Sequence, residues 1–225
     1  MMKKNILTVG ILSVMALSAN AQIKLKSTLD SISYSIGVNI ARSLQQQSLD
    51  SIDPYVMVKG INDVFGSRQL DVDEAKGGAL IQKFITDTKS KKLNKNKTIS
   101  DNYLNENKKR KGVITTASGL QYEIIKKGEG VLPKSTDKVT VHYTGTLIDG
   151  RKFDSSVDRG QPATFPVTGV IKGWVEALQL MPVGSKWKLF IPADLAYGQN
   201  PQPGGIIEPN MALIFEVELI KIDNQ

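Results

Sequence analysis

The sequence of 225 residues predicts an α+β protein with a helical N-terminal part and a C-terminal antiparallel sheet. Between Ser27 and Lys89, apolar residues recur at spacings of three and four, as on one face of a helix. From Gly112 onward they alternate with polar residues, as on a strand, and a single helical stretch interrupts the alternation. We therefore divide the chain into a signal peptide (1–21), a helical domain (22–88), a basic connecting helix (89–111) and a sheet domain (112–225).

The first 21 residues are typical of a secretory signal peptide. Lys3 and Lys4 form a positive start, and the apolar run from Ile6 to Leu17 is too short to span a bilayer. Ala19-Asn20-Ala21 fits the small-residue rule for cleavage, which would leave a mature chain beginning at Gln22. We expect a periplasmic or otherwise exported protein without a stable membrane anchor; an uncleaved anchor is the alternative.

Three short helices are predicted before residue 89. The first carries one apolar stripe, formed by Leu29, Ile32, Ile36, Ile40 and Leu44. The second has Asp53 as its N-cap and Pro54 at its first position, and it ends near Gly66. About sixty residues form only a thin core, and such a unit often completes its burial against a second copy.

The third helix is expected to begin at Asp71, because Glu74 follows three residues later as in a capping box. Leu80, Ile81, Phe84 and Ile85 form its apolar face. Gly77 and Gly78 each cost roughly 1 kcal/mol relative to alanine inside a helix. They fit either the close approach of another backbone or a local kink.

The connecting segment 89–111 contains nine lysines and arginines against two acidic residues, so the whole formal charge of +7 comes from this segment. It lacks interleaved aromatic residues and any nucleic-acid motif, which favours a solvated connector over a phosphate-binding stripe. We interpret it as a continuation of the third helix that is exposed on most sides. Five asparagines weigh against continuity, and Thr98 or Ser100 could restart a second helix.

The C-terminal part contains strand patterns in "GLQYEIIKKGEG", "KVTVHYTGTL", "GSKWKLFIP" and "MALIFEVELIKI". In the second, Val139, Val141 and Tyr143 share one face, and His142 lies on the other. "GVIKGWVEALQLMPVG" is the one helical piece, so we expect an antiparallel sheet wrapped over one short helix.

Several kinds of catalytic site are excluded by residue type. The chain has no cysteine and one histidine, which rules out disulfides, a thiol nucleophile and the usual zinc ligand sets; we expect no metal and no cofactor.

His142 cannot share a pocket with Tyr143, and Ser155 and Ser156 lack the sequence context of a catalytic triad. Asp154 and Asp158, next to Arg159, are better explained as a salt-bridged loop than as paired catalytic carboxylates. Neither a P-loop nor a GxGxxG motif is present. The remaining candidate is a dry aromatic site.

Four blocks resemble the FKBP-type peptidyl-prolyl cis–trans isomerases in order, over about residues 113–222. They are "VTVHYTGTLIDGRKFDSSVDRGQP", "VIKGWVEALQLMPVGSKWKLFIP", "LAYGQ" and "GGIIEPNMALIFEVELIKI". "SYSIGVNIARSLQQQSLDSIDPYVMVKGINDVF" and "ENKKRKGVITTASGLQY" resemble the dimerisation domain and junction of the macrophage infectivity potentiator-like subgroup. The resemblance implies a prolyl isomerase with an N-terminal helical dimerisation domain.

The resemblance also implies a set of site residues. Trp174 would form the floor of the pocket, and Tyr143, Phe153 and Phe215 its aromatic walls. The backbone N–H of Ile171 and the hydroxyl of Tyr197 would bind substrate carbonyls. Asp154 would lie near the twisting amide, oriented by Arg159 and Tyr143. The remaining substrate-binding positions would be Val170, Ile206 and Ile207.

Taken one by one, Trp174, Val170 and Phe215 could equally be core residues, and Tyr197 a plain loop tyrosine. Three departures from the family pattern are visible. Ala163 stands where many members carry phenylalanine, so one wall is lower. The loop "QNPQPGG" differs in length and sequence, which bears on the preference for the residue before proline. Glu208 replaces a frequent proline, which we interpret as surface variation.

The implied chemistry needs no proton transfer. Rotation about a peptide bond faces a barrier of about 18–20 kcal/mol, because the planar amide is stabilised by resonance. The twisted amide is less dipolar than the planar one, so a dry aromatic pocket binds it preferentially and lowers the barrier. Carbonyl anchors on both sides fix the geometry.

Two functions are compatible with the sequence. The first is a dimeric, exported isomerase that acts on unfolded or nascent proline-containing polypeptides and also has chaperone activity. The second is a dimeric client-binding chaperone whose isomerase activity is incidental. The full set of aromatic pocket residues favours the enzyme, since a holdase has no need of it. Nucleic acid is not an expected partner.

Overall fold

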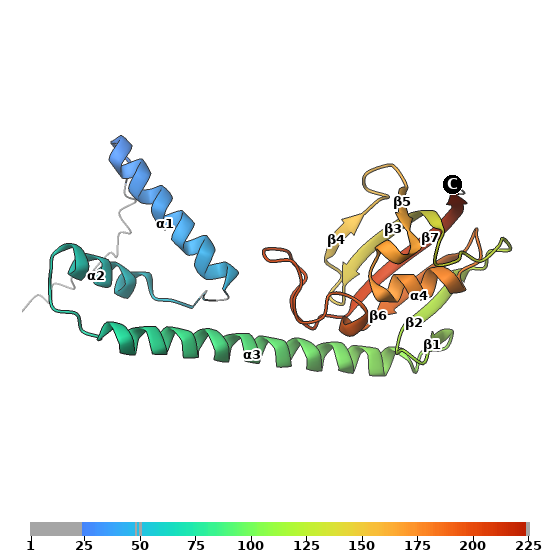
Figure 1. Ribbon diagram of the computed structural model, residues 1–225, viewed down its shortest axis with the longest axis horizontal. Helices are drawn as coiled ribbons and strands as arrows, with labels where there is room; N and C mark the ends of the chain where they lie inside the picture. The colour runs from blue at the N-terminus through green and yellow to red at the C-terminus, as the bar shows by residue number, and fades with distance from the viewer. Residues whose placement is uncertain (1–23, 48, 50, 224–225) are drawn as a thin grey trace, which may run out of the picture. The chain divides into compact units, whose positions relative to one another are not determined.

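The computed structural model describes residues 24–47, 49 and 51–223 (Figure 1). The predicted signal peptide, residues 1–21, lies outside this range. In the part that is described, no helix is long and apolar enough to cross a membrane. The contacts between residues divide the chain into two compact units, with the division between Ser43 and Leu44. This division coincides with neither of the predicted domain boundaries at residues 88 and 111, which stay predictions.

The first two helices are α1 (Thr28–Gln46) and α2 (Pro54–Phe65). The carboxylate of Asp53 caps α2 by accepting hydrogen bonds from the backbone N–H groups of Tyr55 and Val56, and Gly66 is the C-cap, as predicted. None of the described residues of α1 is buried, and its apolar stripe is exposed, with Leu29 at 70%.

Helix α3 (Glu74–Asn107) is a single helix of 34 residues, so the asparagines do not interrupt it. The predicted N-cap at Asp71 is wrong by two residues. Asp73 is the N-cap, and its carboxylate accepts a hydrogen bond from the Lys76 backbone N–H at 3.0 Å. Asp71 instead forms an ion pair with Lys59 at 2.5 Å.

The C-terminal part forms an antiparallel sheet in the order β1-β2-β6-β7-β3-β4, with β5 paired to β3 (Figure 1). The strands are β1 (Val113–Thr115), β2 (Gln121–Lys126), β3 (Lys138–Leu147), β4 (Lys152–Ser155), β5 (Ala163–Pro166), β6 (Lys186–Ile191) and β7 (Leu213–Asp223). Short 3₁₀ turns, η1 (Val167–Gly169) and η2 (Ala193–Leu195), follow β5 and β6. The predicted α+β architecture is confirmed.

Helix α4 (Lys172–Leu180) packs against the sheet and closes the core. Trp174 and Leu178 are 4% and 1% exposed. A Cβ atom at Gly173 would lie 2.5 Å from Cγ2 of Ile191, so only glycine allows α4 to approach β6 this closely. The N-terminal end of α4 is thereby fixed against the sheet.

Residues 89–111 are exposed on most sides, as expected, but one face of α3 in this range carries three buried side chains. Asn96, Ser100 and Asn107 are only 6%, 4% and 3% exposed. The side chain of Asn107 donates a hydrogen bond to Gln121 of β2 at 2.8 Å. These polar side chains recur at helical spacing because their partners are polar groups of the sheet domain and its loops.

Candidate active site

Four aromatic rings from different elements meet at one end of the core. The ring centroids of Tyr143 (β3) and Trp174 (α4) are 5.3 Å apart at an interplanar angle of 87°. Trp174 and Phe215 (β7) are also 5.3 Å apart, and Phe215 and Phe153 (β4) are 5.4 Å apart at 83°. Such edge-to-face contacts are the favoured geometry for aromatic pairs. We call these four residues the aromatic cluster.

The register of the sheet explains how the rings meet. Gly145 follows Tyr143 on the same face of β3 and is paired with Phe215 of β7. A Cβ atom at Gly145 would lie 2.6 Å from the Phe153 ring and 2.8 Å from the Phe215 ring. Because Gly145 has no side chain, the two rings can pack directly over its backbone.

Asp154 lies beside the cluster and is held by two donors. Its carboxylate accepts hydrogen bonds from the Tyr143 hydroxyl and from the Arg159 guanidinium, which also donates to the Tyr143 oxygen at 3.0 Å. Partial burial raises the pKa of Asp154. The hydrogen bonds from Tyr143 and Arg159 and the charge of Arg159 together lower it by more, so the pKa lies below its usual value. Burial and the neighbouring carboxylate raise the pKa of Tyr143. Asp154 is thus a fixed negative charge.

The other predicted residues lie at three places around the cluster. Val170, Ile171 and Ile207 are partly buried and pack against the core. Ile171 is the N-cap of α4, and its backbone N–H forms no hydrogen bond within the described part of the chain, which leaves it available to a ligand. Tyr197 and Ile206 are 45% and 41% exposed, and among the described residues neither makes a ring contact or a side-chain hydrogen bond with the cluster.

Phe165 is an aromatic neighbour of the cluster that the sequence analysis missed. Its ring centroid lies 6.1 Å from that of Tyr143 and 6.1 Å from that of Trp174. Phe165 is two residues after Ala163 in β5, so the alternation of strand side chains places both on the same face. The phenylalanine ring therefore lies on the same face of β5 as Ala163, where the sequence predicts a lower wall.

His142 and Ser156 lie together, with Nδ1 of the histidine 3.1 Å from the serine hydroxyl oxygen. Ser156 is fully buried, and its hydroxyl oxygen accepts a hydrogen bond from the Tyr143 backbone N–H at 2.8 Å. A buried hydroxyl that supports the backbone cannot reach a substrate, so this pair is structural. The described residues contain no group of three or more histidine, aspartate or glutamate side chains that could hold a metal ion.

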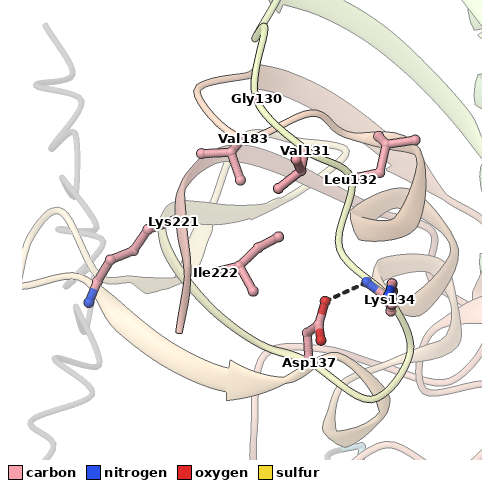
Figure 2. A pocket seen from close by; sticks show the side chains of 8 residues that line it. All are labelled: Gly130, Val131, Leu132, Lys134, Asp137, Val183, Lys221 and Ile222. Carbon is pink, nitrogen blue, oxygen red and sulfur yellow. Dashed lines mark hydrogen bonds between the residues drawn. The ribbon is translucent and has the colours of Figure 1, made fainter. Parts of the chain in front are cut away.

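Glu208 and a hollow in the sheet domain lie outside the aromatic cluster. Glu208 is not simple surface variation, because its carboxylate pairs with Lys92 of α3 at 2.9 Å. A hollow of about 520 Å³ lies between the 130–137 loop and the end of β7 (Figure 2). None of the eight residues that line this hollow belongs to the predicted site.

Comparisons with known proteins agree with this geometry. The family model described as FKBP-type peptidyl-prolyl cis-trans isomerase matches residues 130–220, and the model of the domain amino-terminal to it matches residues 29–124. The chain is 43% identical to "Outer membrane protein MIP" of Legionella longbeachae over 98% of both chains. It is 46% identical to the FKBP-type 22 kDa peptidyl-prolyl cis-trans isomerase of Escherichia coli, over 84% of this chain and 93% of that one.

The chain belongs to the FKBP-type peptidyl-prolyl cis–trans isomerases. The crystal structure of FkpA from Escherichia coli superposes with a TM-score of 0.66 at 34% identity, covering 89% of this chain and 99% of that chain. The predicted family, fold and enzymatic activity are confirmed, so this FKBP-type protein catalyses the rotation of X–Pro peptide bonds. Neither the family models nor the relatives test the roles of individual residues.

Proposed function

We propose that this isomerase acts at the aromatic cluster, with the proline ring of the substrate against Trp174 and between Tyr143, Phe153 and Phe215. The observation that carries the proposal is the convergence of these four rings beside a carboxylate held by Tyr143 and Arg159. Rings and aliphatic side chains exclude water from the amide, which favours the less dipolar twisted state over the planar ground state.

The polar groups around the cluster would fix the peptide on both sides of the rotating bond. The N–H of Ile171 at the start of α4 and the hydroxyl of Tyr197 are proposed to bind substrate carbonyls. Asp154 is proposed to lie against the twisting amide, with Arg159 holding its orientation. Val170, Ile206 and Ile207 complete the apolar contact with the residues flanking proline.

The test is cis-to-trans conversion of an X–Pro peptide by the full chain. We expect Asp154→Ala to lower kcat/KM by about tenfold to a hundredfold and Tyr197→Phe by about tenfold, since both remove groups that position the amide. Asp158→Ala is the matched control, because Asp158 pairs with Lys152 on the surface at 2.6 Å. If Asp154→Ala were as active as Asp158→Ala, the proposed site would be wrong.

We further propose that the protein is exported and works on unfolded or newly translocated polypeptides. The signal-peptide pattern of residues 1–21 supports export, and the relative from Legionella is named an outer membrane protein. Export places the isomerase where proline-limited folding of secreted chains takes place, since uncatalysed X–Pro isomerisation takes tens to hundreds of seconds.

The N-terminal helices are proposed to form a homodimer with a second copy of this chain. Ile32 and Ile36 of α1 are 51% and 54% exposed, and Phe65 at the end of α2 is 86% exposed. Apolar faces of this extent require a partner in water. Ile36→Asp should give a monomer in sedimentation or light-scattering measurements. Gln45→Asp, on the opposite side of α1, should remain dimeric; a dimeric Ile36→Asp variant would refute this interface.

A dimeric chaperone with incidental isomerase activity is the second candidate. The exposed apolar faces of the helices favour it, because they could also hold clients. An Asp154→Ala variant separates the two functions: suppression of client aggregation should persist without isomerase activity if chaperoning is independent.

A further inference from the structure

The loop that follows η2 is anchored to α3 by hydrogen bonds to buried side chains. The Ser100 hydroxyl donates to the backbone carbonyl of Asn210 at 2.9 Å and accepts from the backbone N–H of Ala212 at 2.9 Å. The Asn96 amide donates to the carbonyl of Pro209 at 3.0 Å and to the carboxylate of Glu208 at 3.2 Å. Two side chains of α3 thus bind four of the five residues 208–212.

Two further contacts join the same segment to α3. Lys92 forms an ion pair with Glu208 at 2.9 Å, and the Asn210 side chain donates to the backbone carbonyl of Leu93 at 3.2 Å. Asn96, Ser100 and Asn210 are 6%, 4% and 8% exposed. Removing the partner of a buried polar group costs more free energy than removing the partner of an exposed one. These contacts therefore favour one position of residues 208–212 on α3.

The anchored segment connects directly to the proposed substrate-binding residues. Asn210 has a left-handed backbone, with φ of 59°, and its N–H donates to the carbonyl of Gly198 at 2.8 Å. Gly198 is adjacent to Tyr197, and Ile207 immediately precedes Glu208. A shift of residues 208–212 would therefore move Tyr197 and Ile207 together.

We infer that Asn96 and Ser100 of α3 are positioning residues of the isomerase reaction, which hold the 197–212 loop in place and set the preference for the residue before proline. This inference rests on the proposed placement of Tyr197, Ile206 and Ile207 against the substrate. The loop contains "QNPQPGG", whose glycines give the backbone many conformations, so an external anchor is needed to fix it.

The test compares variants of the full chain on peptides that differ in the residue before proline. We expect Ser100→Ala and Asn96→Ala each to lower kcat/KM by about tenfold and to change the order of preference among these peptides. Ser100→Thr retains the hydroxyl, so its kcat/KM and its order of preference should match those of the parent chain. Ser100 also lines a hollow of about 230 Å³, so its surroundings are not completely filled.

Two control variants on α3 separate loop positioning from general stability. Asn107→Ala removes a buried contact with Gln121 of β2 but none with the loop. Asn102→Ala changes an exposed residue. Both should retain kcat/KM within about twofold and keep the order of preference.

Hydrogen exchange of the loop amides supplies a readout that is independent of activity. Exchange within residues 198–212 should accelerate in Ser100→Ala and remain unchanged in Asn107→Ala. Unchanged exchange, or faster exchange with unaltered kcat/KM and preference, would overturn the inference. An active Asp154→Ala enzyme would instead disprove the proposed site, so the two failures are distinguishable.

Discussion

At the scale of single residues, Gly145 decides whether the aromatic cluster can form. Because a Cβ atom would lie 2.6 Å from the Phe153 ring, Gly145→Ala must displace at least one ring. We expect a loss of about 1–3 kcal/mol in the free energy of unfolding, as in overpacked cores, together with a lower kcat/KM. Gly60→Ala is the control, because a Cβ atom there meets no atom within 4 Å. Thermal unfolding and the peptide assay check both, and equal kcat/KM in the two variants would contradict the prediction.

The ionisation of Asp154 predicts the pH dependence of the reaction. Burial raises its pKa, but Tyr143 and Arg159 together lower it to below the usual value, while the pKa of Tyr143 is raised. The stability contributed by Asp154 is therefore fully present above the unfolded pKa of about 3.9 and is lost as the pH falls through the lower folded pKa. Between about pH 5 and pH 9 neither group changes its proton, so kcat/KM should be flat.

Arg159→Gln provides the control for this profile. Removal of the guanidinium takes away a hydrogen bond and a positive charge from Asp154, so the acid limb of kcat/KM should move to higher pH. A bell-shaped profile for the unmodified enzyme within the flat range would show instead that proton transfer takes part in the reaction.

The sequence was enough to place some residues around the site but not others. The strict alternation in β3 was enough to separate His142 from Tyr143. Phe165 was missed, although the two-residue spacing places it on the same face of β5 as Ala163. Glu208 was misjudged because its partner, Lys92, is more than a hundred residues away in the chain, and no local pattern shows such a contact.

At the scale of elements, the start of α3 distinguishes two aspartates. Asp73 caps the helix, whereas Asp71 forms an exposed ion pair with Lys59. We expect Asp73→Ala to lower the free energy of helix unfolding by about 1 kcal/mol, and Asp71→Ala by less than about 0.5 kcal/mol. Denaturant unfolding followed by far-ultraviolet circular dichroism measures the difference. Equal losses would mean that the cap contributes nothing beyond surface charge.

The continuity of α3 shows why propensity alone does not settle an element. Asparagine disfavours helix interiors because its side chain competes with the backbone for hydrogen bonds. In α3 the side chains of Asn96 and Asn107 bond to the sheet domain and its loop instead. This tertiary pairing removes the competition at these two positions, and it is not visible in the sequence of the helix.

At the scale of the whole molecule, the apolar stripe of α1 was predictable, but its exposure was not. The spacing of Leu29, Ile32 and Ile36 identifies a helix with one apolar face, and the structure leaves that face exposed. Periodicity indicates that a face needs a partner without identifying the partner. A second copy of this chain is the proposed partner, and it would place two isomerase sites in one particle.

Two sites in one particle should affect long clients and short peptides differently. A short peptide occupies one site, so kcat/KM for it should be the same in the parent chain and in monomeric Ile36→Asp. An unfolded polypeptide with several prolines can engage both copies, and the second contact is then intramolecular, which raises its affinity by about 10²-fold or more. We therefore expect Ile36→Asp to lose client binding and refolding activity while retaining the peptide rate. Binding of an unfolded, proline-rich client, measured beside the Gln45→Asp control, tests this. If the monomer bound the client as tightly as the dimer, each copy would act alone, and the N-terminal helices would serve only to join the two copies.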